Sequence, residues 1–383
     1  MRIGIDASNV GSGGGVTHLK EILNNLPEEE WIESVILFAS QQVLDKLPNS
    51  NKIIKKTYSE FNKKIIHRLW FQIFKYDNEV KRYCDILLAV TGDYIGNFKP
   101  LIGMSRNMLL YERDIWKEIN SKKEVIRFWL NFKKQKKSFK NSEGIIFISQ
   151  YAKKRVNEVL NITNKNQVLI HHGVSPKFKG IINSQEFVGN YDNSRPFNFI
   201  YVSSIHVYKY QWNVVKAISN LRKKGFPVKL TLIGGSIFKP AEDLLIKTIK
   251  EVDSNGEFIS YLGHLVYENI EKEYKKADGI IFASTCENMP NILIESMSSA
   301  LPIACSSKAP MPEFLDSGGF YFEPKLVQSI ENSLVKLLNS PKERELMIKE
   351  NLERIKKYSW NKTAEETFSF IRDTYNKFKN VEK

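Results

Sequence analysis

The sequence predicts an α/β protein made of two domains, each built on a parallel sheet of the Rossmann type. Its 383 residues exceed what one ordinary core holds. Short apolar segments alternate with amphipathic helical segments along most of the chain, which is typical of parallel sheets. The alternation stops at a polar segment and then restarts. A composition of 42% hydrophobic and 26% charged residues indicates a globular protein rather than a disordered one.

The first half begins with a strand, a loop and a helix in Rossmann order. Residues 2–7 are apolar and predict a strand, residues 11–15 are rich in glycine and predict a tight turn, and residues 17–26 have helical apolar spacing. We expect a first domain over residues 1–182. Its further strands are predicted at residues 35–39, 86–90, 101–104, 144–148 and 167–171.

The second half repeats this alternation after a linker. Residues 183–196 are rich in Asn, Ser, Asp and Gly and end at Pro196, immediately before a new strand. We expect a second domain over residues 197–361. Its strands are predicted at residues 199–203, 229–233, 259–263, 280–283 and 303–305, and its helices at residues 211–224, 242–255, 269–276 and 291–300.

The three cysteines do not have the spacing of a metal site. Cys84, Cys286 and Cys305 are scattered and odd in number, which favours a reducing compartment. The chain starts directly in a strand pattern, and no segment approaches the roughly 20 apolar residues that span a bilayer. We therefore expect a cytoplasmic protein.

The positive charge is local. The net charge is +14, and residues 51–140 hold 21 Lys and Arg against 9 Asp and Glu. A concentrated positive field suits phospholipid headgroups, a lipid diphosphate or nucleic acid, and a solvated basic face is the alternative.

The glycine cluster at residues 11–15 lies between a strand and a helix. Missing side chains let a ligand approach the backbone and the positive end of the helix dipole. A nicotinamide site would need an acidic residue after the second strand, but residues 40–42 are Ser-Gln-Gln, and no Gly-Lys-Ser/Thr follows the glycines. A tight turn without a ligand is the other interpretation.

Two carboxylates frame a helix start in the second half. Glu287 follows an apolar strand, Pro290 suits the first turn of a helix, and Glu295 lies about one turn further on. Carboxylates accept hydrogen bonds from paired hydroxyls, as in a sugar or a ribose. The amides of residues 288–291 can hold phosphate or sugar oxygens.

This stretch resembles family 4 of the GT-B glycosyltransferases, whose E-x7-E motif matches Glu287 and Glu295. The resemblance extends to residues 201–209, 263–265, 303–307 and 310–313, and to the glycine loop, and it is stronger in the second half. It implies two Rossmann-like domains that face a central cleft, the first for the acceptor and the second for the nucleotide sugar. It also implies that the last helix, residues 362–383, packs back on the first domain.

The resemblance implies roles for single residues. Glu287 would contact the hydroxyls of the donor sugar, Glu295 those of the ribose, and Lys209 the diphosphate, so that Glu287 and Lys209 are the catalytic candidates. A nearby ammonium would stabilise the charge of the departing nucleoside diphosphate. The predicted donor-binding set is Gly13, Gly14, Gly15, Ser204, Lys209, His264, Leu265, Glu287, Asn288, Met289, Pro290, Asn291 and Glu295.

The sequence departs from the family at two places. Ser204 stands where relatives often carry a second phosphate-binding Arg, and the loop after a central strand of the first domain lacks their His. Arg106 and Asn107 occupy that loop and are candidate contacts to donor or acceptor. His18 is another candidate contact, although packing is the commoner role for a histidine beneath such a loop.

The resemblance implies a retaining transferase. The acceptor hydroxyl would attack on the face that the phosphate leaves. The chain contains no Asp-x-Asp pair, so we expect metal-independent transfer without a cofactor. The donor would be linked to UDP or GDP, and the acceptor would be a glycan or lipid-linked saccharide of O-antigen, lipopolysaccharide or capsule assembly. The alternatives are a sugar-nucleotide 2-epimerase of the same fold and a basic nucleic-acid-binding protein, although no nucleic-acid module is visible.

Two basic helical tracts combine Lys and Arg with aromatic residues. They cover residues 61–75 and 127–140. For the second tract we predict contact with an anionic membrane surface, which would place the protein at the inner face of the cytoplasmic membrane. For Trp70 and Phe74 a core-facing position is equally compatible with the pattern.

Overall fold

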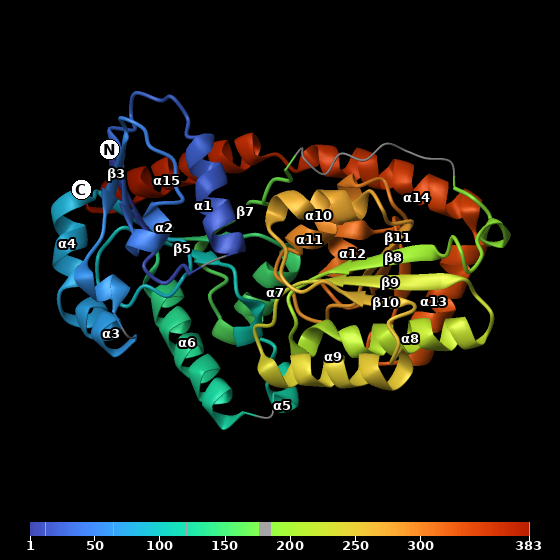
Figure 1. Cartoon of the computed structure of the whole chain (residues 1–383). Coiled ribbons are helices and arrows are strands. Elements are labelled where there is room, and N and C mark those ends of the chain that lie inside the picture. The colour runs from blue at the N-terminus through green and yellow to red at the C-terminus, as the bar shows by residue number, and fades with distance from the viewer. Residues whose placement is uncertain (12, 64, 120, 176–184, 383) are drawn as a thin grey trace. The chain divides into compact units, whose positions relative to one another are not determined.

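The computed structural model of the chain (Figure 1) describes all residues except 12, 64, 120, 176–184 and 383. It divides into two compact units. The first unit comprises Met1–Trp116, Asn120–Gly173 and Tyr358–Lys383, and the second comprises Lys117–Ile119 and Val174–Lys357.

The first unit is built on a seven-stranded parallel sheet with the order β3-β2-β1-β4-β5-β6-β7. Strands β4, β5 and β6 are buried along their whole length, because helices cover both faces of a parallel sheet. The strands are β1 (Arg2–Asp6), β2 (Ser34–Phe38), β3 (Ile53–Lys56), β4 (Ile86–Ala89), β5 (Leu101–Ser105), β6 (Gly144–Phe147) and β7 (Asn166–Leu169).

The helices of the first unit include one from the end of the chain. In α15, Ala364, Phe368 and Ile371 are buried in the same core cluster as Ile3 and Ile5 of β1. The last helix therefore completes the core of the first unit. The helices are α1 (Gly14–Asn24), α2 (Gln41–Leu44), α3 (Ile65–Phe74), α4 (Tyr76–Tyr83), α5 (Arg113–Glu118), α6 (Lys122–Asn141), α7 (Gln150–Leu160) and α15 (Trp360–Glu382), with α5 extending into the second unit.

The second unit is built on a six-stranded parallel sheet with the order β10-β9-β8-β11-β12-β13. The strands are β8 (Phe197–Val202), β9 (Val228–Ile233), β10 (Ile259–Tyr261), β11 (Gly279–Phe282), β12 (Ile303–Ser306) and β13 (Phe320–Phe322). The helices are α8 (Gln211–Lys223), α9 (Lys239–Val252), α10 (Tyr267–Tyr274), α11 (Asn291–Ser298), α12 (Met311–Leu315), α13 (Val327–Asn339) and α14 (Pro341–Arg354).

The structure confirms the predicted fold class of two Rossmann-like parallel-sheet domains. The sequence missed β3, an edge strand that ends in two lysines, and the three-residue β13. The first helix starts at Gly14 rather than at residue 17, so the end of the glycine cluster forms its first turn. Residues 183 and 184 of the predicted linker lie outside the described residues.

The packing of α15 gives a first prediction. Phe368 is 1% exposed within the core cluster of the first unit, so Phe368→Ala removes a buried ring and leaves a cavity. We expect a loss of roughly 3–5 kcal/mol in the unfolding free energy of this unit, measured by denaturant titration. Lys362→Ala on the exposed side of α15 is the control, with an expected change within about 0.5 kcal/mol. Equal losses in the two variants would contradict this role for α15.

Candidate functional site

The strand order of the second unit reverses between β8 and β11. From β8 the chain continues to β9 and β10 on one side, whereas β11 continues to β12 and β13 on the other. The loops that follow β8 and β11 therefore diverge, and ligands bind where such loops leave a crevice at the carboxyl ends of the strands. Lys209 follows β8, and Glu287 follows β11.

The loop that carries Lys209 is tied to the loop that carries Glu287. Lys209 ends a short 3-10 helix, η5 (Val207–Lys209), and its carbonyl oxygen accepts a hydrogen bond from the Tyr201 hydroxyl at 2.8 Å. The carbonyl oxygen of Tyr208 accepts hydrogen bonds from the backbone N–H of Thr285 at 2.8 Å and from its hydroxyl at 3.3 Å. These hydrogen bonds thus hold the two loops together.

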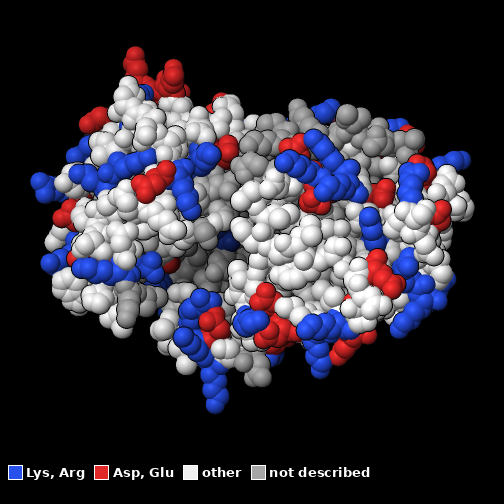
Figure 2. Space-filling view, viewed as in Figure 1, with Lys and Arg blue, Asp and Glu red and all other residues white. Residues whose placement is uncertain are grey.

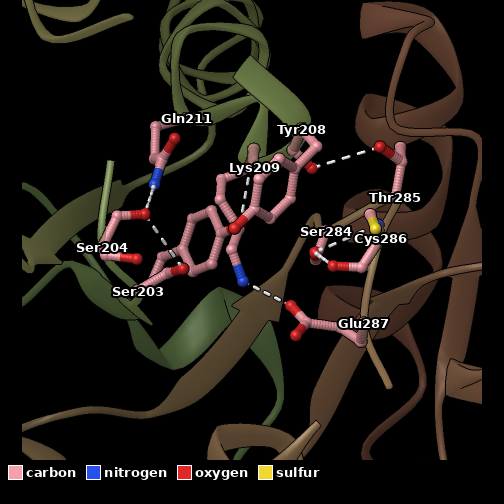
Figure 3. A network of polar contacts seen from close by, with 10 residues as sticks. Ser203, Ser204, Tyr208, Lys209, Gln211, Ser284, Thr285, Cys286 and Glu287 are labelled. Carbon is pink, nitrogen blue, oxygen red and sulfur yellow. Dashed lines mark hydrogen bonds and ion pairs between the residues drawn. The ribbon is translucent and has the colours of Figure 1, made fainter. Parts of the chain in front are cut away.

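Lys209 and Glu287 form an ion pair across the loops (Figure 3). Their side chains are 7% and 18% exposed, and the ammonium lies 5.2 Å from the ring centre of Tyr208 and 5.6 Å from that of Phe282. The ammonium bonds to Oε1, and within the part of the chain that the structure describes no hydrogen bond reaches Oε2 of Glu287. The pair therefore leaves an acceptor oxygen for a ligand.

The tyrosines around this pair stay neutral. Burial raises the pKa of Tyr201 well above its ordinary value, and the negative charge of Glu287 raises it further. The same two causes, in the same order, raise the pKa of Tyr208. The ion pair is therefore surrounded by uncharged rings, which strengthens the attraction between its partners.

The helix start after Glu287 matches the sequence prediction in position. Pro290 is the residue before α11, Asn288 and Met289 are buried, and Asn291 is the first helical residue. Glu295 lies half-buried within α11. The structure places Glu295 one turn inside this helix and Glu287 on the loop before it.

Ser204 and His264 lie on two loops that glycines bring together. Gly234 has φ 149°, and a Cβ there would come within 1.9 Å of the Ser203 carbonyl oxygen, so only glycine fits. Its N–H donates to the carbonyl oxygen of Gly263 at 2.8 Å. His264 is exposed, Leu265 beside it is half-buried, and the Ser204 carbonyl oxygen accepts from the Gln211 side chain at 3.1 Å.

Residues 184–354 match the sequence profile of the family described as "Glycosyl transferases group 1". We refer to this matched segment, which lies within the second unit, as the group 1 domain. The switch point with Lys209 and Glu287 thus lies inside the group 1 domain.

Curated relatives match the chain at low identity. An O-antigen chain mannosyltransferase B from Escherichia coli is 25% identical over 33% of this chain and 34% of its own length. The sulfoquinovosyl transferase SQD2 from Arabidopsis thaliana is 27% identical over 52% of this chain and 38% of its own length. The chain therefore spans little more than a third of the length of these two relatives.

Solved structures share the whole fold. A sucrose-phosphate synthase from Thermosynechococcus elongatus superposes with a TM-score of 0.73 at 15% identity, covering 98% of this chain and 99% of the other. The Anabaena protein HepE in complex with UDP-glucose superposes with a TM-score of 0.70 at 14% identity, covering 96% and 99%. The fold is therefore GT-B, and the group 1 domain is its second half.

The first unit has a switch point of its own, between β1 and β4. A pocket of about 440 Å³ lies there, at the carboxyl ends of β1, β4 and β5. The predicted contacts Arg106 and Asn107 line it, and so does Gly15 from the glycine cluster. The lining residues are Asn9, Val10, Gly11, Gly15, Arg68, Thr91, Asp93, Arg106, Asn107, Leu110, Arg127, Asn131, Lys134 and Gln135.

The glycine cluster shapes one wall of this pocket. Gly13 has φ 65°, a left-handed conformation that favours glycine, and precedes α1. A Cβ on Gly15 would come within 3.0 Å of Val10 and 3.7 Å of a guanidinium nitrogen of Arg106. Arg106 donates to the Gly14 carbonyl oxygen at 2.8 Å. The missing side chain of Gly15 thus makes room for Val10, and Arg106 reaches the first turn of α1.

Asp6, at the end of β1, was not predicted to matter. It is 1% exposed and accepts hydrogen bonds from the Ser8 N–H and the Tyr76 hydroxyl, both at 3.0 Å. Burial raises its pKa to about 6. Asp6 therefore holds the backbone at Ser8, immediately before Asn9, which lines the pocket. No motif in the sequence marks it, because its role depends on burial.

His18 does not line the pocket. It is fully buried, its ring is stacked on His172 with 4.7 Å between centres, and Trp360 lies 6.1 Å away. Burial lowers the pKa of His18 well below its ordinary value. Of the two roles considered for His18, a ligand contact and packing, the structure supports packing.

The basic helices α3 and α6 carry exposed apolar side chains. Trp70 and Phe74 of α3 are 48% and 65% exposed, so the core-facing alternative is wrong for both. Trp129 of α6 is 48% exposed, and Lys and Arg side chains project from the first unit where α6 begins (Figure 2). Among the described residues no helix is long and apolar enough to cross a membrane.

The ion pair of the group 1 domain predicts a specific pattern of stabilities. Lys209→Met leaves the Glu287 carboxylate buried without its partner, which we expect to lower the unfolding free energy by roughly 3 kcal/mol. Lys209→Met combined with Glu287→Leu removes both charges and should recover most of that loss. Denaturant titration of the single and double variants measures this coupling. Additive losses would show that the two side chains do not depend on each other.

Asp6 predicts a pH dependence. Its pKa is higher in the folded than in the unfolded state, so the folded protein binds more protons between about pH 4 and pH 6. The stability of the first unit should fall by on the order of 2–3 kcal/mol as the pH rises through this window and then level off.

Asp6→Asn keeps the acceptor oxygen and cannot titrate, so unfolding titrations at a series of pH values should lose this slope. Asp45→Asn, an exposed change, should keep it. A slope that persists unchanged in Asp6→Asn would refute the assignment.

Proposed function

We propose that this protein is a retaining, metal-independent glycosyltransferase that moves a sugar from a UDP- or GDP-linked donor to a glycan or lipid-linked saccharide. The observation that supports this most is the Lys209–Glu287 pair at the strand-order reversal of the group 1 domain. The pair places a cation beside a carboxylate that can accept hydrogen bonds from hydroxyls. This matches a nucleotide sugar, which carries a diphosphate beside sugar hydroxyls.

In the proposed reaction Glu287 and Lys209 contact different parts of the donor. Glu287 accepts hydrogen bonds from sugar hydroxyls through the oxygen that Lys209 leaves open, and Lys209 contacts the diphosphate. As the bond from the anomeric carbon to the phosphate oxygen breaks, its electron pair passes to the phosphate. Lys209 stabilises this growing charge, which favours the transition state over the ground state.

The acceptor completes the proposed reaction. Its hydroxyl oxygen bonds to the anomeric carbon on the face that the phosphate leaves, and its proton passes to the departing phosphate oxygen. No protein nucleophile is required, so Glu287 and Glu295 are assigned to binding rather than to covalent catalysis. Asn288 to Asn291 and Glu295, at the start of α11, would complete the donor site with the phosphates and the ribose.

The setting we propose is surface polysaccharide assembly of the O-antigen or capsule type, on the cytoplasmic side of the membrane. The matched O-antigen chain mannosyltransferase supports this class of acceptor. The exposed tryptophans of the basic helices α3 and α6 support peripheral contact with anionic lipid.

The experiment is a panel of UDP- and GDP-sugars screened by thermal shift, followed by transfer assays with saccharide acceptors. A ligand at 100 times its dissociation constant stabilises the folded state by about 2.7 kcal/mol. Nuclear magnetic resonance of the product would report whether the anomeric configuration is retained. Turnover of the donor without an acceptor would instead indicate an epimerase, and steeply salt-dependent binding of nucleic acid without transfer would indicate a nucleic-acid-binding protein.

Two substitutions test the assigned roles. We expect Glu295→Ala to weaken donor affinity at least about tenfold, because one hydrogen-bonded charge is worth about 1.5–3 kcal/mol. Lys209→Ala should reduce kcat more than donor affinity, with the protein still folded. Lys216→Ala, which removes an exposed lysine of α8, is the matched control. Kinetic constants that match the unsubstituted protein in both site variants would contradict the proposal.

A further inference from the structure

The pocket of the first unit is strongly cationic. Arg68, Arg106, Arg127 and Lys134 line it, and Asp93 is the single carboxylate among its lining residues. Asp93 accepts hydrogen bonds from two neutral side chains of the pocket wall, Thr91 and Asn9. The lining of the pocket therefore carries four cations against one carboxylate.

Three of these cations have no ion-pair partner within the described part of the chain. Arg127 pairs with Glu124, but no ion pair is formed by Arg68, Arg106 or Lys134. The Nε atom of Arg106 is buried and, among the described residues, has no hydrogen-bond partner. Burial lowers the pKa of Lys134, the charge of Asp93 raises it in part, and the charge of Arg68 lowers it. Desolvated cations of this kind are stabilised by an anion.

Three elements of the first unit bring these cations to the pocket. Arg106 is held by the Gly14 carbonyl oxygen at the start of α1. Arg68 lies one turn before Gln72, whose side chain donates to the Ser8 hydroxyl at 2.8 Å. On α6, Arg127, Asn131 and Lys134 share one face because they are spaced by four and three residues. The cations are thus prearranged around one cavity of about 440 Å³.

The two helices that supply these cations also present apolar side chains to solvent. On α3, Ile66, Trp70, Ile73 and Phe74 are exposed, and on α6, Ile126, Trp129 and Leu130 are exposed. The ammonium groups of Lys75 and Lys133 lie 5.0 and 5.2 Å from the rings of Trp70 and Trp129. Amphipathic tryptophans beside lysines are typical of helices at a membrane surface.

We propose that this pocket binds the phosphate of a lipid-linked acceptor, so that the acceptor is a phosphate-bearing lipid saccharide rather than a neutral glycan. The inference rests on the proposed transferase function. Phosphate oxygens would accept hydrogen bonds from Arg106 and Lys134, and the lipid would remain at the membrane beside the apolar side chains of α3 and α6. The pocket thereby selects the acceptor by its charge.

The test measures binding of the full-length chain to phosphatidylcholine vesicles with and without a polyprenyl diphosphate. We expect preferential binding to the doped vesicles. Lys134→Gln and Arg106→Gln should each weaken that binding about tenfold, because each loses a charge-assisted hydrogen bond. Lys136→Gln removes the same charge from the same helix outside the pocket and should leave the preference intact. Circular dichroism checks that each variant is folded.

Equal binding to both kinds of vesicle would overturn the proposal. So would equal losses of binding to the doped vesicles in Lys134→Gln and Lys136→Gln. A third contrary outcome is that the pocket variants lose affinity for the sugar nucleotide while their vesicle binding is unchanged. The last result would assign the pocket to the donor diphosphate. Lys209→Ala should bind doped vesicles normally. Selective vesicle binding by a chain that binds no sugar nucleotide would refute the transferase function and leave the anion pocket standing.

Discussion

Both polar sites of the protein lie at the point where a parallel sheet reverses its strand order. Between β1 and β4, and again between β8 and β11, neighbouring strands send their following loops in opposite directions. Side chains that are far apart in sequence therefore meet at the carboxyl ends of adjacent strands. The cationic pocket forms at the first reversal and the Lys209–Glu287 pair at the second. The fold thus provides two polar sites without interrupting either core.

The ion pair explains how a charged site exists inside a packed unit before any ligand binds. A lone ammonium or carboxylate would be costly among the rings of Tyr201, Tyr208 and Phe282, whereas the pair is neutral overall. Because Glu287 bonds to Lys209 through one oxygen, the donor that we propose would engage the other oxygen without breaking the pair. In the proposed reaction the cation would already be in place for the leaving group, so little reorganisation would be needed.

The sequence predicted those features that depend on local pattern. Buried strands such as β4 and β11 are continuous apolar runs, and Glu287 and Glu295 are recognisable by their spacing around a helix start. The ion pair was not predicted, because Lys209 and Glu287 are 78 residues apart in sequence and come together only when β8 pairs with β11. Asp6 was missed for a related reason, since its raised pKa arises from burial rather than from a motif.

The α6 helix shows why one basic tract supports both a membrane contact and a binding pocket. Phe128, Phe132, Gln135 and Phe139 are buried at spacings of four, three and four residues, which defines the face that packs on the sheet. Arg127, Asn131 and Lys134 lie beside that face and line the pocket, whereas Trp129 and Leu130 point away from it and are exposed. A count of lysines and aromatics cannot separate these faces, because only the 3.6-residue period assigns each side chain to one of them. The charge that suggested a membrane surface is therefore divided between solvent and a cavity. A phosphate-bearing lipid is a ligand that would use both.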